Sequence, residues 1–187
     1  MSKIKIKNSK QKIADILLKI GCVNINFKNK FTLTSGKKSP VYVDCRKLIS
    51  FPKEREIVIN EMTKLIKSKY KKKVIVAGGE TAGIPYSSFI SHKLNMPMIY
   101  IRKQPKGFGK GKLIEGEYKK KSTSILIEDM ATDGGSKLHF INSLRKNALS
   151  VKDIYVVFFY NIYPVAKKNL NKMKINLNYL ASWHDIR

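Results

Sequence analysis

The feature that most constrains the fold of this chain is an alternation of short apolar runs with amphipathic stretches between residues 74 and 159. The apolar runs are Val74–Ala77, Met98–Ile101, Ile125–Ile127 and Ile154–Phe159, and helical patterns cover Ile84–Leu94 and Ser136–Asn147. Strands that are apolar throughout are buried on both faces, as in parallel sheets covered by helices. The alternation therefore predicts an α/β fold with a central, mostly parallel sheet and helices on both faces.

The first 70 residues follow a different pattern. Two helical patterns and two alternating stretches are present, the helices over 9–20 and 52–70 and the strands over 27–33 and 41–45. Gly21 follows the first helical pattern, where glycine often ends a helix, and Pro52 opens the second. We expect residues 1–70 to form a small N-terminal hood within a single domain spanning 1–187.

Composition narrows the class of protein. Apolar residues make up 43% of the chain, which is enough for a full core without disulfides. No apolar stretch is long enough to cross a membrane, and the basic N-terminus lacks the apolar segment of a signal peptide. Cys22 and Cys45 do not have metal-binding spacing. These observations predict a reduced, cytoplasmic protein with no membrane segment and no protein-bound metal.

The net charge of +25 raises the question of nucleic-acid binding. The lysines are spread along the chain, for example at Lys3, Lys71–Lys73, Lys119–Lys121 and Lys174, and only five of the 38 basic residues are Arg. Because Arg is the preferred residue for bidentate contacts with phosphates and bases, we do not expect dedicated nucleic-acid binding. The positive charge should instead keep the surface soluble and attract anionic substrates.

The segment with the most chemical content is 125–136, where an apolar run meets two acids and then a Thr/Gly turn before a helical pattern. Successive backbone N–H groups in such a turn, together with the helix N-terminus, form a phosphate site. Gly134 and Gly135 permit close approach of a ligand to the backbone. Thr132 and Ser136 supply hydroxyl donors.

The two acids, Glu128 and Asp129, would repel a ligand that consisted of phosphate alone. They are explained if a sugar lies between them and the phosphate, because carboxylates accept hydrogen bonds from sugar hydroxyls and stabilise positive charge on a ribose ring. The alternative is an ordinary strand–loop–helix junction with a capping Asp or Ser, although the pattern is longer than a capping box.

Two further segments suit a doubly phosphorylated ligand. Three glycines in Ala77–Gly83 follow one apolar run and would let backbone amides surround a pyrophosphate; the alternative is a purely structural turn. Residues 102–117 combine glycines with five cations, Arg102, Lys103, Lys106, Lys110 and Lys112. We expect this loop to be mobile and to close over an anionic substrate, and the alternative is a solvated basic hairpin.

The 125–136 segment resembles the motif with which type I phosphoribosyltransferases bind phosphoribosyl pyrophosphate (PRPP). Three other segments resemble those of the orotate phosphoribosyltransferase family: Phe31–Gly36 followed by Ser39–Asp44, Ala77–Pro85, and Arg102–Gly107. The resemblance covers roughly residues 10–160. It implies an enzyme of pyrimidine biosynthesis that transfers ribose 5-phosphate from PRPP to orotate, giving orotidine 5′-monophosphate and pyrophosphate.

The resemblance also implies roles for individual residues. Catalytic roles fall on Glu128, Asp129, Lys103 and Lys106. The implied PRPP site comprises Gly79, Glu80, Thr81, Ala82, Arg102, Lys103, Lys106, Glu128, Asp129, Met130, Ala131, Thr132, Asp133, Gly134, Gly135 and Ser136. Orotate is expected against Val41, Tyr42, Val43, Thr132 and Tyr160. The family further implies a homodimer that shares the 102–117 loop between subunits, and Mg2+ carried on PRPP oxygens, since Mg2+ favours substrate phosphates.

Four positions depart from the family pattern. Cations that other members carry are replaced by Thr34, by Ala82 in the pyrophosphate turn and by Tyr160 where orotate binds, and Phe108 replaces a loop histidine. Lys110, Lys112, Arg46 and Lys47 are candidates to supply some of the missing charge. Two other functions stay open: transfer to a different base, and a non-catalytic PRPP sensor that binds nucleic acid.

Overall fold

The computed structural model describes residues 2–32, 36, 38–105, 112–132, 135–162 and 164–186, without the side chains of 2–8, 135–136 and 164–167. Its largest described sheet has six strands in the order β10-β9-β8-β5-β6-β7. The strands are β5 Ile75–Gly79, β6 Met98–Ile101, β7 Ile114–Glu115, β8 Thr123–Ala131, β9 Ser150–Phe159 and β10 Asn176–Ser182. All neighbours pair in parallel except β7, which is antiparallel to β6. The predicted mostly parallel sheet is confirmed.

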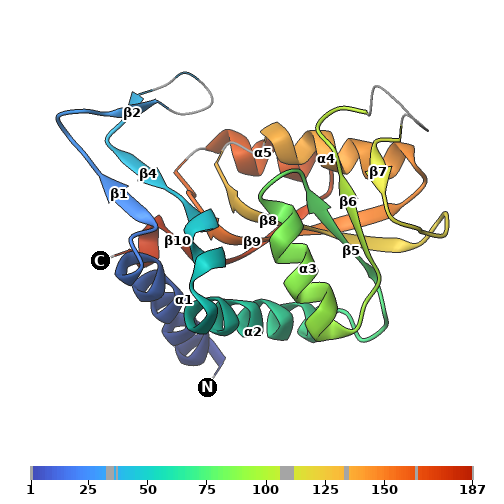
Figure 1. The fold of residues 1–187 in the computed structure, drawn as a ribbon, viewed down its shortest axis with the longest axis horizontal. Coiled ribbons are helices and arrows are strands. Elements are labelled where there is room, and N and C mark those ends of the chain that lie inside the picture. The colour runs from blue at the N-terminus through green and yellow to red at the C-terminus, as the bar shows by residue number, and fades with distance from the viewer. Residues whose placement is uncertain are drawn as a thin grey trace.

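Helices cover both faces of the sheet, as predicted (Figure 1). The helices are α1 Ser2–Lys19, α2 Pro52–Lys69, α3 Gly83–Leu94, α4 Gly135–Lys146 and α5 Pro164–Lys172. Alternate strand residues point to opposite faces, so Val76 packs in the core beneath α1, α2 and α3. Its neighbour Ala77 packs in the second core, beneath α4 and α5.

The hood consists of short strands that project from one corner of the molecule (Figure 1). Strand β1 (Val23–Ile25) pairs antiparallel with β4 (Val41–Val43), and β2 (Phe31–Thr32) pairs antiparallel with β3 (Lys38–Ser39). A 3-10 helix, η1 (Cys45–Ser50), leads to α2. Helix α1 packs against β10 and the final 3-10 helix η2 (Trp183–Asp185), and η1 packs against α2 and β8.

Several expectations about the elements need correction. The strand expected over 27–33 is confined, within the described residues, to Phe31–Thr32, and Phe27 is 75% exposed in a bend. Strand β8 does not end at Ile127 but continues through both acids to Ala131. Strands β7 and β10 and helix α5 were not predicted.

The sheet is anchored at its amino end by the buried carboxylate of Asp153, which is 0% exposed. It accepts hydrogen bonds from Lys69 and Tyr70 at the end of α2. The side-chain amides of Asn176 and Asn178 on β10 donate to it at 3.2 Å each. Burial acts to raise the pKa of Asp153, but these partners outweigh burial and lower it. A buried charge with this many partners ties α2 to β9 and β10.

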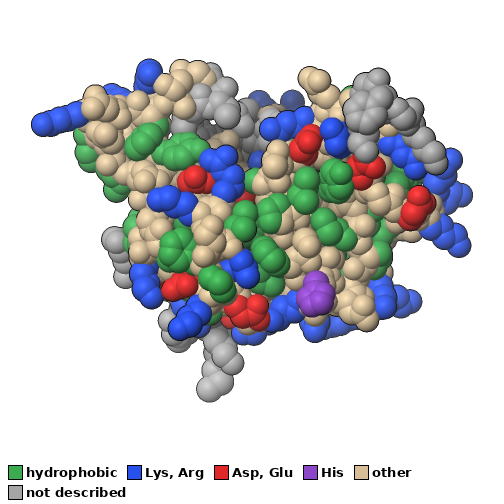
Figure 2. All heavy atoms as spheres, in the orientation of Figure 1, with side chains coloured by type: hydrophobic (Ala, Val, Ile, Leu, Met, Phe, Trp, Pro, Cys, Tyr) green, Lys and Arg blue, Asp and Glu red, His purple; other side chains and the backbone are tan. Residues whose placement is uncertain are grey.

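In the part of the chain that the structure describes, no helix combines the length and apolar character needed to cross a membrane. Lys and Arg side chains are scattered over the face drawn in Figure 2, with acidic side chains among them. On this face the net charge is therefore distributed, in keeping with the spread of lysines along the sequence.

Candidate active site

The candidate site lies at the carboxyl ends of β5, β6 and β8, where ligands bind in open α/β sheets. The parallel register places Gly79 beside Ile101 and Gly78 beside Ile127. This arrangement brings three segments together that are far apart in the sequence: the 79–83 turn, the start of the 102–117 loop and the acids of β8. Each of these segments carries predicted site residues.

The two acids of β8 emerge on opposite faces of the strand, because successive strand residues alternate. Glu128 faces α4, where its Oε2 lies 3.0 Å from the ammonium of Lys137. Asp129 faces the hood, within electrostatic range of Arg46 and Cys45. A ligand at this edge of the sheet would therefore meet one carboxylate from each side of β8.

Glu128 is only 4% exposed and fits tightly against glycine. A Cβ at position 79 would lie 2.1 Å from Glu128 Oε1, and one at position 83 would lie 2.5 Å from it. Side chains are thus excluded at Gly79 and Gly83. Oε1 is buried against these two glycines, and among the described residues it makes no hydrogen bond of normal geometry.

The pKa of Glu128 is raised to about 7, mainly by burial. The Lys137 ammonium and the N–H of Gly79 act to lower it, whereas the Asp129 carboxylate acts in the same direction as burial. Burial also raises the pKa of Asp129, whereas Lys137, the N–H of Met130 and Arg46 lower it. That N–H donates to Asp129 Oδ1 at 2.8 Å. Both carboxyl groups are therefore in an environment that disfavours their charge in the absence of a ligand, which is frequent at functional sites.

Glu80 joins the 79–83 turn to the end of β6 and the start of the basic loop through one backbone and one side-chain hydrogen bond. The N–H of Glu80 donates to the carbonyl of Ile101 at 2.9 Å, and the N–H of Lys103 donates to Glu80 Oε2 at 2.7 Å. The Glu80–Thr81 peptide is cis. Arg102 has a buried Nε without a hydrogen-bond partner among the described residues. The predicted pyrophosphate residues are thus brought together as far as Lys103; Lys106 and Lys110 lie outside the described residues.

The phosphate turn is described only in part. Ala131 is buried at the end of β8, Thr132 is half-buried and α4 begins at Gly135. Asp133 and Gly134 lie outside the described residues, as do the side chain of Ser136 and the departures at Thr34 and Phe108. The predicted junction of strand, turn and helix N-terminus is present around this gap.

Two of the residues predicted to contact orotate, Val43 and Tyr160, meet at the base of the hood. Tyr160 is 2% exposed, and its hydroxyl accepts a hydrogen bond from the N–H of Val43 at 3.1 Å. Tyr42 packs its ring against Phe31, with centroids 5.6 Å apart. Its hydroxyl accepts a hydrogen bond from Arg46 at 2.9 Å. Tyr160 therefore supports the hood strand, and its burial leaves little ring surface for a ligand.

The two hood cations proposed to supply missing charge differ in their surroundings. Arg46 Nε donates to Asp44 at 2.7 Å, and the guanidinium is close enough to Asp129 to lower its pKa. Lys47 donates to the carbonyl of Gly21 at the end of α1, at 2.8 Å. Arg46 consequently adds positive charge to the site, whereas the ammonium of Lys47 is bonded to a carbonyl at the end of α1.

Sequence reasoning missed one cation, Lys137. Its side chain is 12% exposed and lies in the first turn of α4, which begins directly after the phosphate turn. The signal was available, because side chains in a first helical turn point back toward the N-terminus, here toward the strand end. In a chain this rich in lysine, however, nothing in the sequence separates Lys137 from surface lysines.

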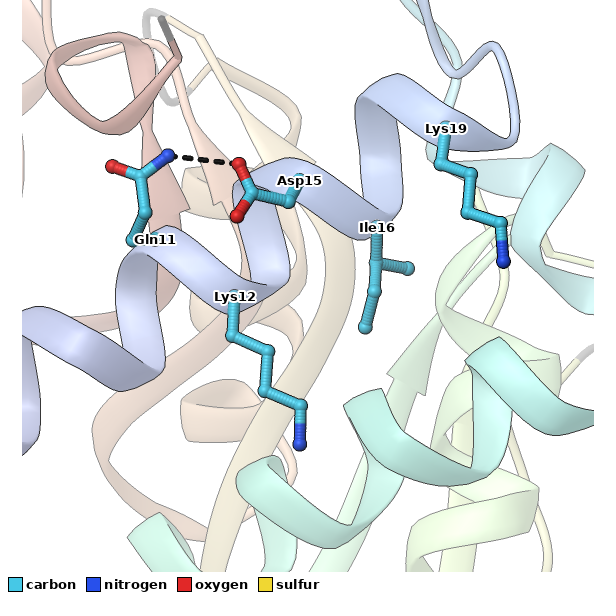
Figure 3. A pocket seen from close by; sticks show the side chains of 5 residues that line it. All are labelled: Gln11, Lys12, Asp15, Ile16 and Lys19. Carbon is cyan, nitrogen blue, oxygen red and sulfur yellow. Dashed lines mark hydrogen bonds between the residues drawn. The ribbon is translucent and has the colours of Figure 1, made fainter.

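Two described pockets lie away from the acids. One of about 400 Å³ is formed along α1 by Gln11, Lys12, Asp15, Ile16 and Lys19 (Figure 3). Another, of about 580 Å³, lies at the amino ends of β5 and β8 and is lined by several lysines, including Lys71, Lys72 and Lys73. Neither contains a residue predicted to bind PRPP or orotate.

Comparison with known proteins finds no matching family model, but it does find close relatives. The chain is 42% identical over 175 residues to the orotate phosphoribosyltransferase of Ruegeria sp., which covers 92% of this chain and 77% of the relative. Among solved structures, Leishmania donovani UMP synthase superposes with a TM-score of 0.81 at 33% identity, covering 96% of this chain and 38% of that one. Orotate phosphoribosyltransferase from Aeropyrum pernix gives 0.79 at 27% identity, covering 93% and 95%.

Proposed function

This chain belongs to the orotate phosphoribosyltransferase family, and we propose that the acids of β8, the 79–83 turn and the hood divide the tasks of the reaction among them. The enzyme transfers ribose 5-phosphate from PRPP to orotate, releasing pyrophosphate, in pyrimidine biosynthesis. The observation that carries the assignment of residues is the buried pair Glu128 and Asp129 beside the glycines of the 79–83 turn.

We assign the ribose to the two acids. Glu128 and Asp129 approach from opposite sides of β8 and would accept hydrogen bonds from the ribose hydroxyls. As the bond to pyrophosphate breaks, positive charge develops on the ribose ring, and two nearby carboxylates in a buried site stabilise that charge strongly. The 5-phosphate would bind at residues 131–136, where backbone N–H groups and the N-terminus of α4 favour an anion.

The departing pyrophosphate is assigned to residues 79–82 together with Arg102, Lys103 and Lys106. The hydrogen bond from the Lys103 N–H to Glu80 supports this assignment, because it holds the start of the basic loop beside the turn. The buried Arg102 Nε would gain an acceptor from a phosphate oxygen, which relieves an unpaired donor. Closure of the loop would exclude water from the reacting ribose.

Orotate would lie at the base of the hood, between Thr132 and the strand Val41–Val43. Because the Val43 N–H is bonded to Tyr160, we assign Tyr160 the role of holding this strand in place. The orotate N1 anion is already a nucleophile, so catalysis consists mainly of positioning and charge stabilisation.

We further propose that Mg2+ arrives with PRPP, carried on its diphosphate and ribose oxygens. The residues fit such an ion, because two buried carboxylates place negative charge beside the expected ribose. In the described residues no group of three His, Cys, Asp or Glu side chains is arranged to hold a metal by itself. When bound, the ion would neutralise charge on the departing pyrophosphate.

The homodimer and the cytoplasmic location are proposals from family resemblance. The two cysteines are free and buried, in keeping with a reducing compartment. If the 102–117 loop serves the neighbouring subunit, mixing inactive Lys103→Ala and Asp129→Asn chains should restore part of the activity, because some mixed dimers contain one intact site. Sedimentation equilibrium gives the oligomeric state independently.

The assay that tests the function follows orotate depletion in the presence of PRPP and Mg2+, with adenine, guanine, hypoxanthine and uracil as competing acceptors. We expect turnover with orotate that requires both PRPP and the metal. Activity on another base without orotate turnover would overturn the acceptor assignment while leaving the use of PRPP in place.

A further inference from the structure

Arg46 lies between the hood strand and the strand that carries the site acids. It is the second residue of η1, which follows β4 in the chain and packs against β8. Its guanidinium is close enough to Asp129 to lower the pKa of that carboxyl. Its side chain is 55% exposed, so a ligand can reach it. Arg46 is therefore an accessible cation beside the place proposed for orotate.

The position of Arg46 is fixed through both its backbone and its side chain. The hydroxyl of Tyr86, a buried residue of α3, donates to the carbonyl of Cys45 at 2.6 Å and so ties the start of η1 to the core. The Arg46 Nε donates to Asp44 Oδ1 at 2.7 Å, and Nη2 donates to the Tyr42 hydroxyl at 2.9 Å. A guanidinium held in this way loses little further freedom when it binds a ligand.

These contacts leave part of the guanidinium available. Among the described residues, Nη1 of Arg46 makes no hydrogen bond, and Nη2 has a second N–H beyond the one that it gives to Tyr42. Arg commonly binds a carboxylate through two N–H groups at once. Asp44 weakens the attraction for a second anion, but it occupies Nε and leaves the Nη1 and Nη2 donors for a ligand.

Two other hood cations are engaged elsewhere. The ammonium of Lys47 is bonded to the carbonyl of Gly21, and that of Lys38 donates to the Thr32 hydroxyl at 2.6 Å in the pair β2–β3. Orotate is uracil with a carboxylate at C6. A site that prefers orotate must offer donors to this charged group, because a charge that leaves water without partners is costly to bind.

We propose that Arg46 recognises the carboxylate of orotate through Nη1 and Nη2 and thereby selects this acceptor over uracil. The inference rests on the proposed placement of orotate between Thr132 and Val41–Val43. The carboxylate does not react, so Arg46 would keep the same contact with the product, orotidine 5′-monophosphate (OMP). Asp44 and Tyr42 would then be positioning residues, because they hold the guanidinium in place.

Calorimetric titration of OMP and uridine 5′-monophosphate (UMP) tests the proposal without turnover, because the two nucleotides differ only in this carboxylate. We expect the wild type to bind OMP more tightly. Arg46→Met should weaken OMP binding about tenfold or more, as expected for the loss of hydrogen bonds to a charged group, and leave UMP binding nearly unchanged. Arg46→Lys keeps the charge without the paired donors, so its loss should be intermediate.

Lys30→Met is the matched control for the loss of one hood cation, because Lys30 is exposed; its preference for OMP should equal that of the wild type. Steady-state kinetics provide a second readout: in Arg46→Met the KM for orotate should rise, whereas the KM for PRPP should stay near the wild-type value. Should Arg46→Met fail to fold, Arg46→Gln carries the same test, since it also removes the charge.

Two results would overturn the proposal. Equal weakening of OMP and UMP in Arg46→Met would show that Arg46 only supports the hood, and unchanged OMP binding would show that the carboxylate lies elsewhere. In both cases a wild type that consumes orotate leaves the proposed function in place. A wild type that binds the two nucleotides equally and does not consume orotate would refute the acceptor assignment itself.

Discussion

The hydroxyl of Tyr160 accepts a hydrogen bond from the backbone N–H of Val43 at 3.1 Å, across 117 residues of sequence. Tyr160 directly follows β9, and its ring packs edge-on against Phe158 and Trp183. Val43 is the last residue of hood strand β4. The contact therefore holds the end of the hood strand β4 beside the end of β9, at the position where we place orotate.

Replacing Tyr160 with Phe should loosen the hood. The Val43 N–H loses its acceptor, which costs about 1 kcal/mol or more for a buried donor, and we expect KM for orotate to rise more than KM for PRPP. Tyr155→Phe is the matched comparison, because the buried Tyr155 hydroxyl has no hydrogen-bond partner among the described residues; that variant should be as stable as the wild type or more so. Thermal melts and orotate kinetics check both variants, and equal behaviour of the two would contradict the role of Tyr160.

Asp129→Asn should reduce kcat/KM for PRPP by about 10²-fold or more, since it removes a charge that acts on the reacting ribose. The fold should be retained, because burial already raises the pKa of this carboxyl and disfavours its charge. Asp15→Asn, on the exposed surface of α1, is the control for loss of one carboxylate. Unchanged kinetics in Asp129→Asn would show that the ribose lies elsewhere.

Glu128→Gln should make the ligand-free enzyme more stable at pH 8 while lowering its activity. The pKa of Glu128 is about 7 in the folded state, above its ordinary value of 4.5. The folded state thus binds more protons than the unfolded state between these values, so stability falls as pH rises through that window. A neutral amide removes a penalty on the order of 3 kcal/mol above pH 7.

Melting temperatures of wild type and Glu128→Gln should accordingly converge as pH falls toward 4.5. A gap that stays constant from pH 8 to pH 5 would show that the carboxylate is not responsible. Lys146→Met, measured over the same pH range, controls for general changes in surface charge.

Gly79→Ala should impair both stability and turnover. Its Cβ would lie 2.1 Å from Glu128 Oε1 and 2.5 Å from the ring of Phe140, and overpacking of this kind typically costs about 1–3 kcal/mol. Gly36→Ala is the comparison in denaturant unfolding, because Gly36 has φ +78° but open space around it. A smaller loss of stability in Gly79→Ala than in Gly36→Ala would contradict the steric argument.

Much of the fold could be predicted because burial on both faces leaves a simple pattern. Strands β5, β6, β8 and β9 lie within or around the apolar runs, and α2, α3 and α4 begin at or one residue before the expected position. Strand β10 was missed because Asn176 and Asn178 interrupt its apolar pattern, yet these side chains bind the buried Asp153. The reason for these two polar side chains becomes apparent only in the folded chain, where β10 lies beside β9 and its Asp153.

The site was predictable where residues adjacent in sequence act together, as do Glu128, Asp129 and the turn that follows. It was not predictable where the chemistry depends on contacts between distant segments. The contact of Tyr160 with Val43 and the pairing of Lys137 with Glu128 are of this kind. Strand β8 also runs through its acids because they serve the site, although charged residues rarely occupy a buried strand.

The packing of α1 against β10 has a consequence for how the enzyme is made. The ammonium of Lys10 lies 4.0 Å above the ring of Tyr179, so helix α1, which precedes every strand of the six-stranded sheet in the chain, rests on the strand that follows the other five. Helix α1 therefore lacks its contact with β10 until the intervening strands have been synthesised. Docking of α1 on the sheet, and with it the final placement of strand β1 that follows α1 in the chain, thus comes after synthesis of β10.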